Sequence, residues 1–89
     1  MATMMVRHKV ADFDGWKAVF DEVRPMREEA GEKSATLYRD VDDPNTITAL
    51  FEWDSLENAQ AYAGSARLRT AMERAGVAGP PQIAFLNGA

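Results

Sequence analysis

The chain has 89 residues, of which 46% are hydrophobic and 27% are charged; this composition is typical of one globular domain and excludes a disordered tail or a second folded unit. Its 10 basic and 14 acidic residues give a net charge of -4, which is the wrong sign for a surface that binds nucleic acid or anionic lipid. With no cysteine and one histidine, the chain has no means of forming disulfides, thiolate sites or multi-histidine metal sites.

No apolar run approaches the length of a membrane span, and charges interrupt residues 1–10, where a secretory signal would be apolar. We therefore expect one cytoplasmic domain over residues 1–89, with no membrane and no nucleic acid among its partners.

Residues 4–10 alternate along the chain in a way that predicts a strand, with His8 on the same face as Val6 and Val10. After this strand, Asp12 and Asp14 are candidate caps for a helix.

The predicted helix carries a stripe of apolar residues at three- and four-residue steps and ends at Gly31. Pro25 falls inside the stripe, where it removes a backbone hydrogen bond. We expect either a kink or two shorter helices near this position.

Residues 34–41 and 46–53 are rich in β-branched and aromatic side chains and are separated by turn-forming residues, which predicts an antiparallel hairpin. A second helix should start after Ser55 and end at Gly76. Gly64-Ser65 lies inside it, so we expect either one long helix or a helix that is broken at this position. Prolines at 80 and 81 precede a last predicted strand over residues 82–86.

The order β-α-β-β-α-β is that of the α+β ferredoxin-like fold, a four-stranded antiparallel sheet with both helices on one face. The other face is then uncovered, and its expected residues are Met5, Arg7, Lys9, Leu50 and Glu52. Such a mixed face favours a homodimer that pairs two sheets; a monomer with an amphipathic exposed face is the alternative.

Short sequence motifs at the predicted hairpin are more specific to one family than the order of strands and helices is. They read L-Y-R-D at residues 37–40, D-D-P-N at 42–45 and F-E-W-D-S at 51–55. The chain resembles the antibiotic-biosynthesis-monooxygenase family of dimeric α/β-barrel proteins, in which these motifs recur together, and the resemblance extends over nearly the whole chain. It implies two ferredoxin-like protomers that share a barrel, with a pocket in each protomer between sheet and helices.

The same resemblance implies a range of activities, from cofactor-free oxygenases of polyketide phenols to haem-degrading enzymes, related cyclases and proteins of unassigned role. Trp53 matches the tryptophan of the family's E-W-x-S motif. Haem-degrading relatives ligate iron through a histidine on the second helix, and residues 56–75 contain none; we therefore expect no haem and no other cofactor.

His8 is the candidate general base, because an imidazole among aromatic side chains can take a proton from a phenol or an acidic carbon. Tyr38, at the end of the second strand, is the candidate donor to the resulting oxyanion. The strand and helix residues expected around the substrate are Trp53, Phe51, Trp16, Phe20, Tyr62, Leu68 and Met72.

Each assignment has a structural alternative. His8 could be a half-buried core histidine, Trp53 could fill the core rather than stack on a substrate, and Tyr38 could lie at the dimer interface.

The leading functional hypothesis is therefore a cofactor-independent oxygenase or cyclase of small aromatic or polyketide-like molecules. Two others stay open: a non-catalytic dimer that binds a small apolar ligand, and a domain that serves only in assembly.

Overall fold

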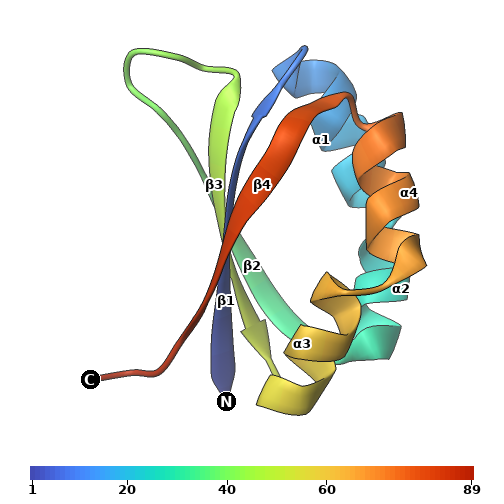
Figure 1. Ribbon diagram of the computed structural model, residues 1–89, viewed down its shortest axis with the longest axis vertical. Coiled ribbons are helices and arrows are strands. Elements are labelled where there is room, and N and C mark those ends of the chain that lie inside the picture. Colours follow the sequence, from blue (N-terminus) through green and yellow to red (C-terminus); the bar gives the residue numbers. More distant parts are fainter.

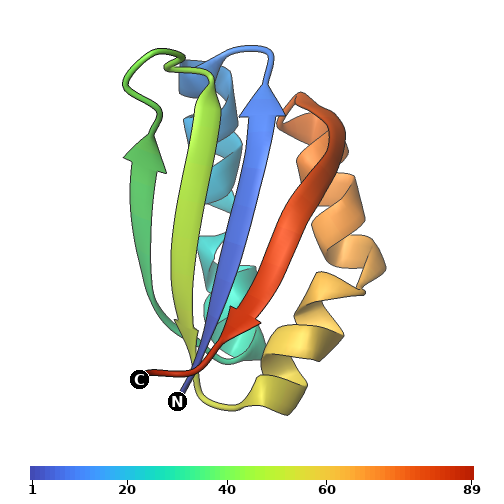
Figure 2. The same ribbon diagram turned by 60° about the vertical axis from the view of Figure 1, so that its left-hand side comes forward.

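A computed structural model describes residues 1–89 and contains a four-stranded antiparallel sheet with helices on one face (Figure 1). The elements in chain order are β1 (Ala2–Val10), α1 (Phe13–Glu22), α2 (Arg24–Ala30), β2 (Glu32–Arg39), β3 (Thr46–Trp53), α3 (Leu56–Ala63), α4 (Ala66–Arg74) and β4 (Val77–Leu86). The strand order is β2-β3-β1-β4, which Figure 2 shows from the side of the uncovered face. This confirms the predicted ferredoxin-like fold, and the sheet of the single chain is open.

Both predicted helical regions are divided into two helices. The first divides at Val23, and Pro25 lies in the opening turn of α2, where its missing N–H would have no helical partner in any case. The second divides at Gly64-Ser65, where the Ser65 side chain caps α4 by accepting from the Leu68 N–H at 3.2 Å. Each region therefore covers the sheet as two short helices, of which α1, α3 and α4 have a side-chain N-cap and α2 begins after Val23 without one.

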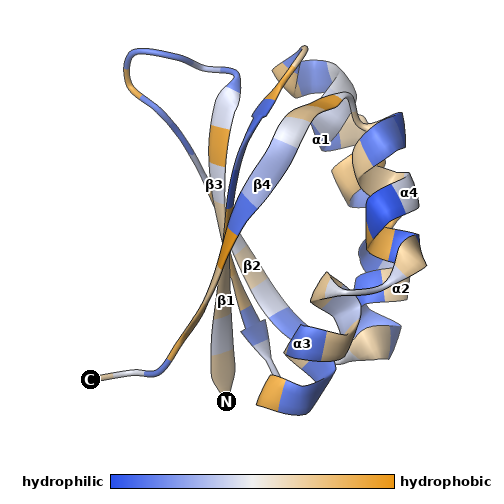
Figure 3. Ribbon diagram, viewed as in Figure 1, coloured by the Kyte–Doolittle hydropathy of each residue, from blue (hydrophilic) through white to orange (hydrophobic).

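The alternation of β1 and β3 decides which side chains face the helices. In β3, Ile47, Ala49, Phe51 and Trp53 are buried while the residues between them are partly exposed. Hydrophobic and hydrophilic bands also alternate along the helices (Figure 3). The core therefore lies between the sheet and the helix layer, and the opposite sheet face is left open.

The last strand begins at Val77, not at Gln82 as predicted. Arg7 pairs with Gln82 and Lys9 with Ala78, so Gly79, Pro80 and Pro81 form an irregularity opposite His8. Prolines cannot donate to a ladder, and an edge-strand bulge is one of the few places that accept them. The prolines therefore interrupt the pairing without ending the strand.

The other strand boundaries differ less. β1 starts at Ala2 rather than at residue 4, and β2 covers Glu32–Arg39 rather than 34–41. The register of β2 against β3 shifts between Glu32 and Ser34, and this shift allows Glu32 to turn into the interior.

Gly31 joins α2 to β2 and positions both elements. Its φ of 124° lies in a region that favours glycine, and its carbonyl accepts from the Asp54 N–H at 2.9 Å. A Cβ on Gly31 would lie 2.5 Å from Asp54 Oδ1. Glycine is therefore required here by both backbone angle and space.

We expect Gly31→Ala to lower the free energy of unfolding by about 1–3 kcal/mol, the usual cost of a strained backbone conformation. Gly64→Ala is the matched control, because Gly64 also ends a helix but has φ -93° and no atom nearer than 3.7 Å to its would-be Cβ. Urea denaturation of both variants measures the difference; equal stability of the two would contradict this account of Gly31.

Candidate functional site

A small cavity of about 60 Å³ lies between the sheet and the helices. Thirteen of its 15 lining residues are hydrophobic, and the other two are His8 and Arg27. The sheet supplies Met4, Val6, His8, Ala49 and Phe51; the helices and the segments that join them supply Trp16, Val19, Phe20, Val23, Arg27, Tyr62, Leu68, Ala71, Met72 and Ala75. An apolar cavity with two polar groups is the usual composition of a small-molecule site.

His8 reaches the cavity because β1 alternates. The residue is 9% exposed and lies on the covered face with Val6 and Val10. Its ring meets the Trp16 ring edge-on at 5.6 Å, and no protein atom is hydrogen-bonded to Nδ1 or Nε2. Burial lowers the pKa of His8 from its ordinary value of 6.5, because a charged imidazole is poorly solvated there. At pH 7 the ring is therefore neutral and has one nitrogen that can accept a proton.

A row of aromatic rings on α1 forms the wall opposite the sheet. Phe13, Trp16 and Phe20 follow one another at three- and four-residue spacing, so they share one helix face. The Trp16 and Phe20 rings stack with centroids 5.0 Å apart, and the Arg27 guanidinium lies 3.8 Å above the Phe20 ring. The row thus places an imidazole beside Trp16 and a guanidinium beside Phe20.

Arg27 is held by a buried ion pair. Its Nε donates to Glu32 Oε1 at 2.8 Å and its Nη1 donates to the Phe20 carbonyl at 2.7 Å. Both charged side chains are almost fully buried, with exposed fractions of 3% and 4%. Burial raises the pKa of Glu32, and the positive charge of Arg27 opposes this rise. Nη2 of Arg27 has no hydrogen-bond partner in the protein.

Sequence reasoning missed Arg27 and Glu32, because charged side chains are usually solvated. One indication was available: Arg27 lies seven residues after Phe20 and four after Val23, in phase with the apolar stripe.

Tyr62 extends from α3 to the cavity. It is 5% exposed, and its ring packs against Trp53 with centroids 5.2 Å apart. Burial raises the pKa of the Tyr62 hydroxyl, and the charges of Arg27 and Glu32 act on it in opposite directions. The hydroxyl therefore stays protonated at neutral pH and can donate a hydrogen bond.

Most residues expected around a substrate lie at the cavity. They are Trp16, Phe20, Phe51, Tyr62, Leu68 and Met72. Trp53 shares the sheet face of His8 but is fully buried behind Tyr62 and does not line the cavity. Its indole therefore packs in the core next to the cavity.

Tyr38 lies on the other face of the sheet. It pairs directly with Thr48 of β3, which is out of phase with the buried residues Ile47 and Ala49, and it is 54% exposed. The sheet therefore separates Tyr38 from His8, the residue with which we expected it to act. Arg27 and Tyr62, like the Trp16 indole, are donor side chains that line the cavity together with His8.

No three side chains of His, Cys, Asp or Glu lie together in a way that could hold a metal ion. None of the helices has the length and apolar character needed to cross a membrane, α1 being the longest with 10 residues.

A ferredoxin-like sheet whose helices enclose an apolar cavity defines a broad class of small α+β proteins. The family model for antibiotic biosynthesis monooxygenase matches residues 1–74, so the chain belongs to the antibiotic biosynthesis monooxygenase family. No functionally curated protein matches the chain.

Solved structures share the fold at low sequence identity. A Bordetella bronchiseptica protein assigned as an antibiotic biosynthesis monooxygenase has a TM-score of 0.81 at 19% identity, and the match covers 99% of this chain and 96% of that chain. SnoaB, a cofactor-independent oxygenase from Streptomyces nogalater, has a TM-score of 0.79 at 14% identity, covering 99% and 92%. Rv0793 from Mycobacterium tuberculosis has a TM-score of 0.69 at 18% identity, covering 99% and 94%. The TM-scores establish a common fold, and at identities this low the similarity shows the fold alone.

Proposed function

We propose that the protein is a cofactor-independent monooxygenase-like enzyme that acts on a small aromatic or polyketide-type molecule, with His8 as the general base. The observation that carries the proposal is an unpartnered imidazole, kept neutral by burial, in the wall of a mostly apolar cavity. Membership of the monooxygenase family supports it, and so does the fold shared with the oxygenase SnoaB.

In the proposed reaction, the unprotonated nitrogen of His8 accepts the proton of a bound phenol or enol. The resulting anion is electron-rich and reacts directly with dioxygen. The reacting carbon carries two hydrogens in the keto form of the substrate. Its anion forms a C–O bond to dioxygen, and the peroxide takes back the proton from His8 to give a hydroperoxide. Loss of water then breaks the O–O bond and the remaining C–H bond and leaves a carbonyl, so that the carbon supplies all four electrons. A cyclase would use the same proton abstraction and then form a carbon–carbon bond within the substrate.

The size of the cavity limits how a substrate binds. A cavity of about 150 Å³ holds benzene, whereas this one measures about 60 Å³. An aromatic substrate therefore requires the wall to move. The α4 side of the wall is best suited to do so, because Met72 is flexible and partly exposed and α4 is separated from α3 by a break at Gly64-Ser65.

We expect His8→Ala to lower turnover of a phenolic substrate such as an anthrone by about 10²–10⁴-fold, the usual contribution of a general base. Wild-type activity should persist at pH 6.5 and fall at lower pH, because the buried imidazole protonates only below that value. Oxygen uptake and product absorbance measure both effects.

Val10→Ala is the matched control, since Val10 is a buried neighbour of His8 on the same face of β1 but does not line the cavity. Unchanged turnover in His8→Ala would eliminate His8 as the base. A thermal shift with flat phenols but no product would instead favour the non-catalytic binder.

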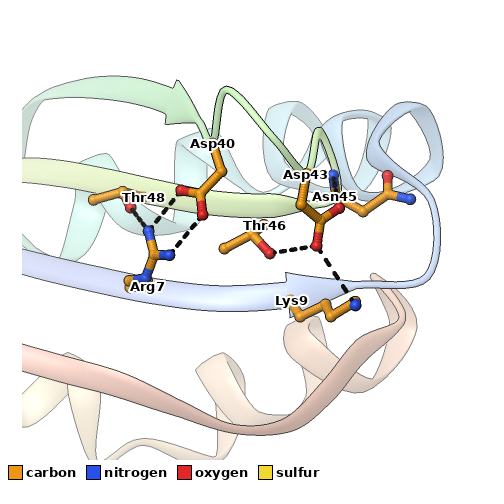
Figure 4. Close-up of polar contacts among 7 residues, drawn as sticks. All are labelled: Arg7, Lys9, Asp40, Asp43, Asn45, Thr46 and Thr48. Atoms are coloured by element: carbon orange, nitrogen blue, oxygen red, sulfur yellow. Dashed lines mark hydrogen bonds and ion pairs between the residues drawn. The ribbon is translucent and has the colours of Figure 1, made fainter.

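We also propose that two copies pair through the open sheet face. Leu50 lies at its centre, opposite Met5 of β1 and Thr36 of β2. The charged groups on this face have partners within the chain. Arg7 donates to both carboxylate oxygens of Asp40 at 2.7 Å and to Thr48 at 3.1 Å (Figure 4), and Glu52 accepts from the Thr3 hydroxyl at 2.8 Å. Polar groups that are already hydrogen-bonded can be covered at a lower desolvation cost.

Leu50→Asp should convert the dimer to a monomer, because each interface would then bury an unpaired carboxylate near its centre. Leu56→Asp is the control, since Leu56 is equally apolar but exposed on α3, on the helix side. Sedimentation velocity at micromolar concentration measures the mass. A monomeric wild type, or a Leu50→Asp variant that still dimerises, would refute pairing through this face.

A further inference from the structure

The guanidinium of Arg27 is a charged group built into the cavity wall. The residue is 2% exposed and lines the cavity, and its Cζ lies over the Phe20 ring, 3.8 Å from the centroid, with the Phe51 centroid 5.9 Å away. Phe20 and Phe51 line the same cavity. The cation is therefore held by the wall itself and is not a surface group that folds back over the site.

Two of the three guanidinium nitrogens have fixed partners. Nε is held by Glu32 Oε1 and Nη1 by the Phe20 carbonyl, at 2.8 and 2.7 Å. These two hydrogen bonds fix the plane and direction of the group, and they leave Nη2 as a buried donor without a protein acceptor. A buried charged donor without an acceptor is unfavourable, so its presence in the cavity wall favours a role beyond stability.

Glu32 balances the charge of Arg27 without blocking Nη2. The pair as a whole is neutral, which reduces the cost of burial, and the fully buried Nη2 becomes available to an oxygen when the cavity wall moves to admit a ligand. The Tyr62 hydroxyl lies in the field of both charges and stays protonated, so it can serve as a neutral second donor.

We propose that Arg27 is the anion-binding residue of this cavity, its Nη2 donating a hydrogen bond to the oxygen of a phenolate or enolate. The occupant is accordingly a flat apolar molecule with one ionisable hydroxyl, whose proton is taken by His8 and whose anion is held by Arg27. This assignment rests on the proposed function, since it takes the cavity to be the substrate site. It identifies a cation as the stabilising group in place of Tyr38.

The test uses para-nitrophenol, whose anion alone absorbs visible light, so that titration of the bound probe reports its pKa. Wild-type protein should bind the anion and lower the pKa of the bound probe. Arg27→Met/Glu32→Met removes both charges together and leaves no lone buried ion. This variant should bind the anion at least tenfold more weakly, which corresponds to one pKa unit.

Glu32→Gln is the matched variant that keeps Arg27 while removing its countercharge. It should bind the anion more tightly than wild type and lower the pKa of the bound probe further, because the positive charge is then uncompensated. A purely structural role of the pair predicts no gain from this change. Circular dichroism of each variant checks that it is folded.

The proposal is overturned if wild type does not bind the probe anion, if the double variant binds it as tightly as wild type does, or if folded Glu32→Gln binds it no more tightly than wild type. His8→Ala separates this proposal from the proposed function: it should keep anion binding while losing turnover. Normal turnover in His8→Ala would refute His8 as the base but leave the proposal for Arg27 standing. Anion binding by the double variant as tight as that of wild type would refute only the proposal for Arg27.

Discussion

The contact between the aromatic row on α1 and the covered face of the sheet is the constraint on which the rest of this structure depends. Trp16 and Phe20 are buried against strand residues and stack on each other at 5.0 Å. Large rings at three- and four-residue spacing hold the helix layer above the sheet. The other cavity walls combine the Phe51 and Tyr62 rings with small or flexible residues such as Ala71 and Met72, and the space next to the α1 rings is incompletely filled.

Polar groups in that space are costly to stability. An imidazole and a guanidinium nitrogen without protein partners each carry a desolvation cost of about 1–3 kcal/mol, and apolar side chains of similar size would often be at least as stable. The two groups differ in chemistry: His8 is kept neutral by burial and accepts a proton, whereas Arg27 is charged and donates hydrogen bonds. An acceptor and a cation in one apolar cavity match a reaction that creates an anion.

The regular spacing of apolar residues in the strands and helices made much of the fold and of the cavity wall predictable from the sequence. The pattern of β1 placed His8 on the covered face, and the apolar stripe of the first helix marked Trp16 and Phe20. Tyr38 was ambiguous, because β2 is mostly exposed on both faces and its register shifts after Glu32. Arg27 was not predictable from residue type alone, since only its partners, fixed by folding, show that the charge is buried.

Nitrogen NMR of the one imidazole tests the central claim, namely that His8 is a buried, neutral imidazole in the wall of a cavity that admits a phenolic ligand. Because the chain has a single histidine, its ring signals are assigned without ambiguity. The account predicts that they titrate with a pKa below 6.5 and shift when a phenol is added. Titration at or above 6.5, with no response to the phenol, would contradict it.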